Sequence, residues 1–222
     1  MDRDRGDVPE ALTNYLALLG WSPGGDVEFF SKEQMAQSFS LERVNPNPAR
    51  FDVKKCTAIN GDWIRHLAID DLVERLVPYL QRDGVIGSTP SAEDMNLVRA
   101  VVPLISERLE TLGQASAMVG FLFTDDIAID AGDAEKIMGD QADDVLREAE
   151  AALAGLDEWT TEAIERALRA TLIEERGLKP KVAFGPVRLA ITGRRVAPPL
   201  VESMELLGAD RSLSRIRSLH AS

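Results

Sequence analysis

The stretch PEALTNYLALLG, residues 9–20, decides the fold class of this chain. It begins with a proline, which helices favour at their first position, and it ends with a glycine, which they favour just beyond the last turn. Its apolar side chains recur every three or four residues and so line one face of a helix: Leu12, Tyr15, Leu16 and Leu19. We therefore predict an amphipathic helix that packs one face against neighbouring helices.

Helical patterns continue along the chain. Ser31 and Gln34 have the spacing of a capping box, which predicts a short helix, and Asp70 or Asp71 is expected to cap a later helix that Pro78 kinks or shortens. Apolar spacing predicts further helical segments at residues 51–64, 70–80, 91–112, 133–153, 160–176, 200–207 and 210–219, after a break at residues 45–48. Because helix-favouring residues dominate and no alternating strand pattern occurs, the predicted class is all-α.

Composition limits the kind of protein. The chain has 222 residues, 45% of them hydrophobic and 28% charged, which is typical of a folded protein with a core. Its single cysteine, Cys56, excludes an intrachain disulfide and a cysteine-based zinc cluster. No stretch approaches the roughly 20 apolar residues that cross a bilayer, and the charged start does not resemble a signal peptide. We therefore expect a cytoplasmic protein with no membrane partner.

Charge is distributed unevenly. The formal net charge of -12 argues against a nucleic-acid partner, because cations drive phosphate binding. However, residues 179–222 carry eight basic and three acidic side chains, a net charge of +5, so the remainder carries -17. An acidic body with a basic C-terminal part is compatible with a nucleic acid that contacts one side only.

The basic part begins with KPKVAFGPVR, residues 179–188. Lys179, Lys181 and Arg188 surround Phe184, a combination that can contact phosphates through the cations and stack an unpaired base on the ring. The alternative is a loop between helical units that carries ordinary surface cations.

Motifs for catalysis and metal binding are missing from the sequence. No glycine-rich phosphate loop occurs, and His66 and His220 lie far apart without paired metal ligands. The acidic pairs at residues 125–126 and 143–144 are interpreted as helix caps and solvated faces, and Cys56 as a core thiol. We expect no catalytic residue and no metal site in this chain.

Three stretches of this chain, in this order, resemble the C-terminal half of bacterial glutamyl-tRNA synthetases, a class I family. They are RDRGDVPEALTNYLALLGWS at residues 3–22, FDVKK with INGDWIR at 51–65, and FGPVRLAITGR at 184–194. The chain departs from the family at Asp7 and at Cys56-Thr57-Ala58, where the family usually has other residue types.

The resemblance implies three helical parts. These are a stem-contact region at residues 1–72 and two packed anticodon-binding units at 73–122 and 123–222. The family's catalytic domain, with its two signature loops, would precede residue 1. The parent would be an ATP-dependent glutamate–tRNA ligase. The chain alone is expected to be inactive and to bind neither ATP nor magnesium, which belong to that domain.

The resemblance also assigns roles to single residues. The family's matching arginine inspects an anticodon base, which implies this role for Arg108, and a planar guanidinium suits the task. The alternative for Arg108 is an exposed helix arginine paired with nearby acids. Contacts to the anticodon loop are implied for Lys179, Lys181, Arg188 and Thr192, and contacts near the stem for Lys55, Asn60 and Arg65. Trp63 and Trp159 are expected to be core anchors.

The leading hypothesis is therefore the tRNA-binding, anticodon-recognition portion of a glutamyl-tRNA synthetase. Its expected partners are glutamate tRNA, with glutamine tRNA left open, and the catalytic domain of the same synthetase. Two alternatives stay open. One is that the chain belongs to an intact, active synthetase, and the other is a free-standing helical interaction or adaptor module derived from one.

Overall fold

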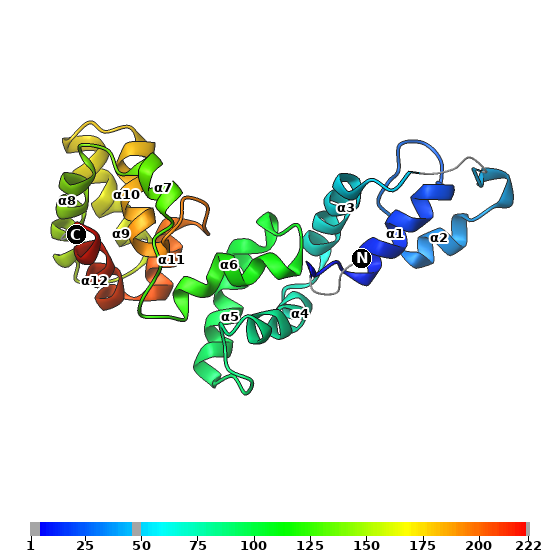
Figure 1. Cartoon of the computed structure of the whole chain (residues 1–222), viewed down its shortest axis with the longest axis horizontal. Helices are drawn as coiled ribbons and strands as arrows, with labels where there is room; N and C mark the ends of the chain where they lie inside the picture. Colours follow the sequence, from blue (N-terminus) through cyan, green and yellow to red (C-terminus); the bar gives the residue numbers. More distant parts are fainter. Residues whose placement is uncertain (1–4, 46–49, 221–222) are drawn as a thin grey trace. The chain divides into compact units, whose positions relative to one another are not determined.

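The computed structural model describes residues 5–45 and 50–220, and within these ranges the chain is helical (Figure 1). The only strand-like pairing in the described part is one antiparallel bridge between Trp21 and Val44. The predicted all-α class is confirmed. Of the predicted break at residues 45–48, residues 46–48 lie outside the described residues.

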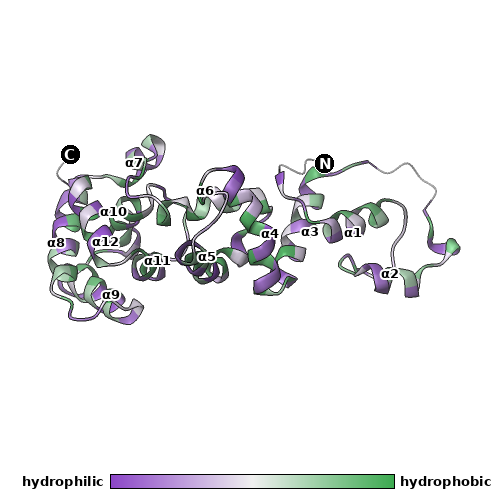
Figure 2. Ribbon diagram, turned by 90° about the horizontal axis from the view of Figure 1, so that it is seen from below, coloured by the Kyte–Doolittle hydropathy of each residue, from purple (hydrophilic) through white to green (hydrophobic). Residues whose placement is uncertain are grey.

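The described α-helices are α1 (Pro9–Gly20), α2 (Lys32–Ser38), α3 (Val53–His66), α4 (Ile69–Arg82), α5 (Ala92–Ile105), α6 (Ala115–Val119), α7 (Ala131–Ile137), α8 (Ala142–Ala154), α9 (Thr161–Leu168), α10 (Pro180–Thr192), α11 (Leu200–Leu207) and α12 (Ala209–His220). Short 3₁₀ turns are η2 (Leu41–Arg43), η3 (Ser106–Arg108), η4 (Leu112–Gln114) and η5 (Gly120–Leu122), and η6 (Arg169–Glu175) is π-helical. Figure 2 shows hydrophobic and hydrophilic residues interspersed along the helices, as amphipathic packing requires.

The chain forms two compact units. The first comprises Met1–Thr89 and Ile105–Ala117, and the second comprises Pro90–Leu104 and Met118–Ser222. The three-part division at residues 72 and 122 stays a prediction.

In the first unit, α1 packs against α3. The N-terminal segment is fixed by Asn60, which is fully buried on α3. Its side-chain oxygen accepts a hydrogen bond from the Val8 amide at 2.7 Å, and its amide donates to the Glu110 carbonyl at 2.6 Å. This one side chain therefore ties three distant segments of the unit together.

Several predicted helix ends differ in the first unit. The predicted helical segment at residues 51–64 is one helix, α3, which begins two residues later than predicted because Asp52 caps it by accepting from the amides of Lys54 and Lys55. The prediction that Asp70 or Asp71 caps α4 is wrong, since both lie inside its first turn, and Pro78 does not end that helix.

The second unit is built around α8, α10 and α12, which pack on one another. In Figure 1, helices α8 to α12 gather into one bundle. Leu146, Val187 and Ile216 are fully buried, one from each of the three central helices. Burial of such side chains is the main stabilising contribution in this unit, at about 1.5–3 kcal/mol each.

Helix predictions in the second unit need three corrections. The predicted helix at 133–153 is two helices, α7 and α8, separated by a turn at residues 138–141. The segment at 160–176 is α-helical only to Leu168 and then π-helical. The loop considered as the alternative for residues 179–188 is instead the first part of α10, which has Pro180 at its start.

Candidate functional site

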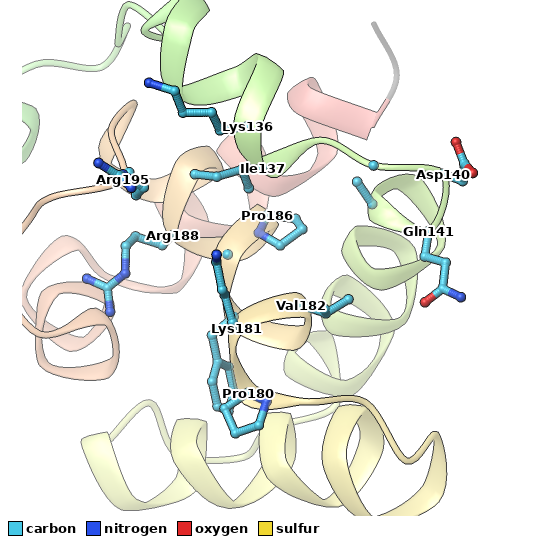
Figure 3. A pocket seen from close by; sticks show the side chains of 14 residues that line it. Lys136, Ile137, Asp140, Gln141, Pro180, Lys181, Val182, Pro186, Arg188 and Arg195 are labelled. Carbon is cyan, nitrogen blue, oxygen red and sulfur yellow. The ribbon is translucent and has the colours of Figure 1, made fainter.

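A pocket of about 760 Å³ opens in the second unit, beside α7 and α10 (Figure 3). Its lining comes from α7, from the turn that follows it, from α10 and from the segment after α10: Lys136, Ile137, Gly139, Asp140, Gln141, Ala142, Pro180, Lys181, Val182, Phe184, Gly185, Pro186, Arg188 and Arg195. The volume is within the range of about 300–1,000 Å³ that is usual for ligand pockets.

Helical spacing on α10 creates one wall. Lys181, Gly185 and Arg188 are four and three residues apart, so they share a face of the helix. Gly185 matters because a Cβ there would lie 3.3 Å from Cγ2 of Ile137, which is tighter than an ordinary contact. The absence of a side chain at Gly185 therefore lets α7 approach α10 and bring its own residues to the pocket.

Arg188 is held in place at the pocket wall. It is half-buried, and its Nη1 donates to the carbonyl of Pro198 at 2.8 Å. This bond joins α10 to the segment that leads into α11. Lys181, in the first turn of α10, is exposed and can reach a ligand.

A second pair of cations comes from outside the predicted basic motif. The backbone amide of Arg195 donates to Oδ2 of Asp133 at 2.8 Å, and Nε of Arg195 lies 3.7 Å from Oδ1 of the same carboxylate. Asp133 thus anchors the segment after α10 to α7, which also carries the exposed Lys136. Both Arg195 and Lys136 line the pocket.

The pocket is electropositive although the whole chain is acidic. Four lining residues are cationic and one, Asp140, is acidic. In Figure 3, the side chains of Lys136, Arg188 and Arg195 lie on one side of the view, opposite Asp140 and Gln141. Ile137, Val182 and Phe184 add apolar surface to the lining. Cations beside apolar and aromatic surface can take a phosphate and an unpaired base.

Thr192 and Lys179 are placed differently. Thr192 is 6% exposed, and its hydroxyl donates to the Arg188 carbonyl at 2.8 Å and accepts from the Arg194 amide at 3.3 Å. It therefore helps to end α10. Lys179 is exposed at the N-cap of α10 and is not part of the pocket lining. For both residues, contact with RNA stays a prediction.

A buried cation outside the pocket lining fixes the end of α10. Arg215 of α12 is 7% exposed and donates to the carbonyls of Ile191 at 2.7 Å and Phe121 at 2.8 Å. Burial lowers the pKa of the Arg215 guanidinium to about 10, and the positive charge of Arg211 adds to this effect. The guanidinium thus connects α12, η5 and α10.

The first unit carries the other predicted contact residues. Arg108 is exposed on η3. The prediction of one helix to residue 112 is wrong here, since α5 ends at Ile105. The segment after Arg108 is fixed by the Asn60 amide and by the Leu112 amide, which donates to the Gly6 carbonyl at 3.0 Å. Arg108 therefore projects from a well-anchored turn.

Lys55, Asn60 and Arg65 lie on α3 but face different surroundings. Lys55 pairs with Glu28, and Arg65 pairs with Asp62 one turn earlier on the same helix. Asn60 is fully buried and uses its amide for backbone contacts, so we give it a structural role.

Structural observations agree with the other interpretations of single residues. Cys56 is buried, and burial raises the pKa of its thiol, which fits a core residue. The indole Nε1 of Trp63 donates to Asn14 Oδ1 at 3.0 Å, and that of Trp159 donates to the Met204 carbonyl at 2.8 Å. Both tryptophans are partly buried anchors.

The described residues contain neither a group of metal-binding side chains nor a helix that could span a membrane. In residues 5–45 and 50–220, no group of three or more His, Cys, Asp or Glu side chains could hold a metal ion. Within the same ranges, no helix combines the length and the apolar character needed to cross a membrane.

Sequence reasoning missed Lys136, Asp140, Gln141 and Arg195 as pocket residues. Lys136 lies near the end of α7, and Asp140 and Gln141 lie in the turn between α7 and α8, which the apolar pattern presents as one continuous helix. A signal does exist at Gly139, since glycine weakens a helix interior. No feature of the sequence singles out Arg195, because only its contact with Asp133 distinguishes it from the neighbouring Arg194.

Two known families match this sequence. The family described as "Anticodon binding domain" matches residues 71–219. The family described as "tRNA synthetases class I (E and Q), catalytic domain" matches residues 2–58.

Curated relatives match nearly the whole chain. The glutamate–tRNA ligase of Saccharopolyspora erythraea is 52% identical over 217 residues, which cover 97% of this chain and 43% of the relative. That of a Nocardioides species is 50% identical over 218 residues, covering 97% of this chain and 44% of the relative. The chain thus spans less than half the length of these relatives.

The fold resembles that of solved structures. A crystal structure of a glutamate tRNA ligase from Elizabethkingia meningosepticum has a TM-score of 0.83 and 24% identity. The likeness covers 99% of this chain and 42% of that one. At this identity the likeness shows the fold alone.

Proposed function

Since this chain belongs to the anticodon-binding domain family, we propose that it binds the anticodon arm of a tRNA. Its sequence matches the anticodon-binding part of glutamate–tRNA ligases, which favours glutamate tRNA as the substrate. Acceptance of glutamine tRNA and a cytoplasmic location are further predictions.

One observation carries this proposal, the electropositive pocket between α7 and α10. Lys181 and Arg188, which the family resemblance selects, both line it, together with Lys136 and Arg195. Phe184 and the neighbouring apolar residues offer a surface on which a splayed base can stack. Arg108 contributes a second proposed contact from the first unit, where its planar guanidinium can hydrogen-bond a base edge.

A second part of the proposal concerns the catalytic domain of a synthetase. We propose that a catalytic domain activates glutamate with ATP and magnesium, and that this chain supplies tRNA recognition only. An ATP-dependent glutamate exchange assay on the 222-residue chain should give no signal. Measurable exchange by the chain alone would contradict this division of labour.

A titration of fluorescently labelled glutamate tRNA tests the binding proposal. The 222-residue chain should bind at low salt, and Lys181→Ala or Arg108→Ala should weaken binding by about tenfold, the typical cost of one lost phosphate or base contact. A matched control is Arg166→Ala, because Arg166 is an exposed arginine of α9 outside the pocket. This variant should bind as the parent does.

Two outcomes would count against the proposal. Absence of binding at low salt would overturn it, since electrostatic attraction is strongest there. Equal losses from Arg166→Ala and Lys181→Ala would show a diffuse charge effect instead of a defined site. Specificity is measured by repeating the titration with glutamine tRNA. Arg108→Ala should reduce any preference for glutamate tRNA over glutamine tRNA.

A further inference from the structure

Arg195 lies in an exposed part of the backbone between α10 and α11. Residues 194–196 are three consecutive exposed positions of this segment. On one side of them, the carbonyl of the buried Gly193 accepts from the Asp130 amide at 2.9 Å. On the other side, Ala197 is 4% exposed. Burial therefore fixes the two ends of the segment, and its middle, where Arg195 lies, depends on hydrogen bonds.

The carboxylate of Asp133 on α7 holds Arg195 by its backbone. Oδ2 of Asp133 accepts from the Arg195 amide at 2.8 Å, whereas Oδ1 lies 3.7 Å from Nε of the Arg195 side chain. The side chain of Asp133 is 20% exposed, against 56% for that of Arg195. The short bond is thus made by the backbone amide, and the guanidinium stays exposed at the pocket that it lines.

Asp133 is itself fixed at the start of α7. Its backbone amide donates to Oδ1 of Asp130, the capping residue of that helix, at 2.9 Å. Two hydrogen bonds therefore run between the start of α7 and the segment after α10, one to Gly193 and one from Arg195. Two such bonds limit the direction of the segment as well as its distance from α7. They also limit the directions in which the Arg195 side chain can leave the backbone.

The negative charge of Asp133 opposes RNA binding, whereas its geometry favours it. A carboxylate close to a phosphate site repels the phosphate, so removal of this charge alone should strengthen binding. A cation that is already held in place loses less conformational freedom when it contacts a phosphate than a mobile one does. The two effects have opposite signs, and substitutions can therefore separate them.

We propose that Asp133 is a positioning residue for RNA. It holds the backbone at Arg195 so that the guanidinium contacts a phosphate of the anticodon arm. Figure 3 shows Arg195 on the same side of the pocket as Arg188 and Lys136, which come from α10 and α7. The inference rests on the anticodon-arm binding proposed above, and it names a residue outside the pocket lining on which that binding depends.

Titration of fluorescently labelled glutamate tRNA separates the two effects. Asp133→Ala removes the acceptor together with the charge, and it should weaken binding by about threefold to tenfold because Arg195 is no longer held. Charge alone predicts the opposite result, a gain of about twofold at low salt. Glu135→Ala is the matched control, since Glu135 is an exposed acid of the same helix outside the pocket lining. This variant should not weaken binding.

Two readouts distinguish positioning from a general loss of structure. In Asp133→Ala, the slope of log affinity against log salt concentration should become shallower by about 0.7–0.9, the value for one lost phosphate contact. Asp133→Asn keeps an oxygen that can accept from the Arg195 amide, so it should bind at least as tightly as the parent within about twofold. Equal losses from Asp133→Ala and Asp133→Asn would overturn the proposal.

A double-mutant cycle tests whether Asp133 acts through Arg195. Arg195→Ala removes the side chain but keeps the backbone amide, and it should lose at least as much affinity as Asp133→Ala. Adding Asp133→Ala to it should cause no further loss. A further loss of about threefold or more would show that Asp133 acts independently of Arg195 and would overturn the proposal.

Two further outcomes are decisive. If circular dichroism shows that Asp133→Ala does not fold, Arg195→Ala at its exposed position still tests the proposal, because unchanged affinity would leave no cation to position. A parent chain that binds no tRNA at low salt would refute the anticodon proposal and this inference with it. A parent that binds, together with an Asp133→Ala variant of equal affinity, would refute the positioning role alone.

Discussion

Arg215 is a buried cation whose hydrogen-bond partners are backbone carbonyls. Its guanidinium donates to Ile191 and Phe121, and both contacts join segments that are far apart in the sequence. Desolvation lowers its pKa, so burial of this charge is itself unfavourable. The hydrogen bonds to these carbonyls offset part of that cost.

We predict that Arg215→Met destabilises the chain by about 2–4 kcal/mol, since carbonyls of η5 and α10 lose their donor inside the protein. Chemical denaturation followed by circular dichroism measures this change. Arg194→Met, at an exposed arginine, should change the free energy of unfolding by about 0.5 kcal/mol or less. Similar values for the two variants would show that the buried contacts of Arg215 contribute little.

At the scale of elements, the end of α10 depends on one glycine. Gly193 has φ of +74°, and a Cβ there would lie only 2.4 Å from the carbonyl oxygen of Ala128. Its own carbonyl accepts from the Asp130 amide at 2.9 Å, just before α7 begins. The position therefore connects the end of α10 to the start of the helix that forms the other side of the pocket.

Gly193→Ala should cost about 2–4 kcal/mol, because it combines the left-handed backbone penalty with a collision against backbone. Gly177 is the matched control, because its φ is +70° and a Cβ there would meet no atom within 4 Å. Gly177→Ala should therefore cost only about 1–2 kcal/mol. Thermal unfolding compares the two variants. An equal cost would mean that the segment at Ala128 moves aside without penalty.

The contact between α8 and α12 contains an ionisable carboxylate, that of Glu150. Glu150 on α8 lies 2.8 Å from His220 Nε2 and also pairs with Arg217, both on α12. The hydrogen bond from His220, followed by that from Arg217, lowers the pKa of Glu150 below its ordinary value of 4.5. A carboxylate with a lowered pKa in the folded state stabilises the fold above its unfolded-state pKa, and this contribution is lost as the pH falls through the folded-state value.

Glu150→Gln should therefore reduce stability by at most about 1 kcal/mol at pH 7, as for other partly exposed pairs. The difference from the parent should shrink as the pH falls below about 4.5. Denaturation at a series of pH values measures it, with Asp143→Asn as a control at an exposed carboxylate of the same helix. A difference that stays constant down to about pH 3 would contradict the assignment to Glu150.

At the scale of the whole molecule, charge asymmetry governs the response to salt. The chain has a net charge of -12, yet residues 179–222 carry +5 and the pocket lining contains four cations. Only the cations that touch phosphates release counterions on binding. The acidic remainder contributes long-range repulsion that salt screens.

We predict that the logarithm of tRNA affinity falls linearly with the logarithm of salt concentration. Lys181→Ala should make this slope shallower by about 0.7–0.9, the value for one phosphate contact. Glu162→Gln, which removes an exposed acid of α9 outside the pocket, should leave the slope unchanged. An unchanged slope for Lys181→Ala would mean that Lys181 does not contact phosphate.

The candidate site is predictable from the sequence only in part. The basic motif and the family resemblance select Lys181 and Arg188, and both line the pocket. Neither signal selects Lys136 or Arg195. Lys136 reaches the pocket because α7 packs closely on α10 at Gly185, and Arg195 reaches it through the bond to Asp133, which joins residues 62 positions apart. Apolar periodicity reports which face of a helix is buried and says nothing about such distant contacts.

The sequence by itself determined the all-α class and several helix ends, because capping, periodicity and helix propensity are local properties. Helices α1 and α11 begin and end within a residue or so of the predicted positions, and α2 begins at its predicted capping box. Tertiary structure alone decided the end of α5, the division of α7 from α8 and the π-helical turn of η6, since packing overrides weak local preferences there. It also decided the pocket, because a cavity exists only where elements distant in sequence are brought together.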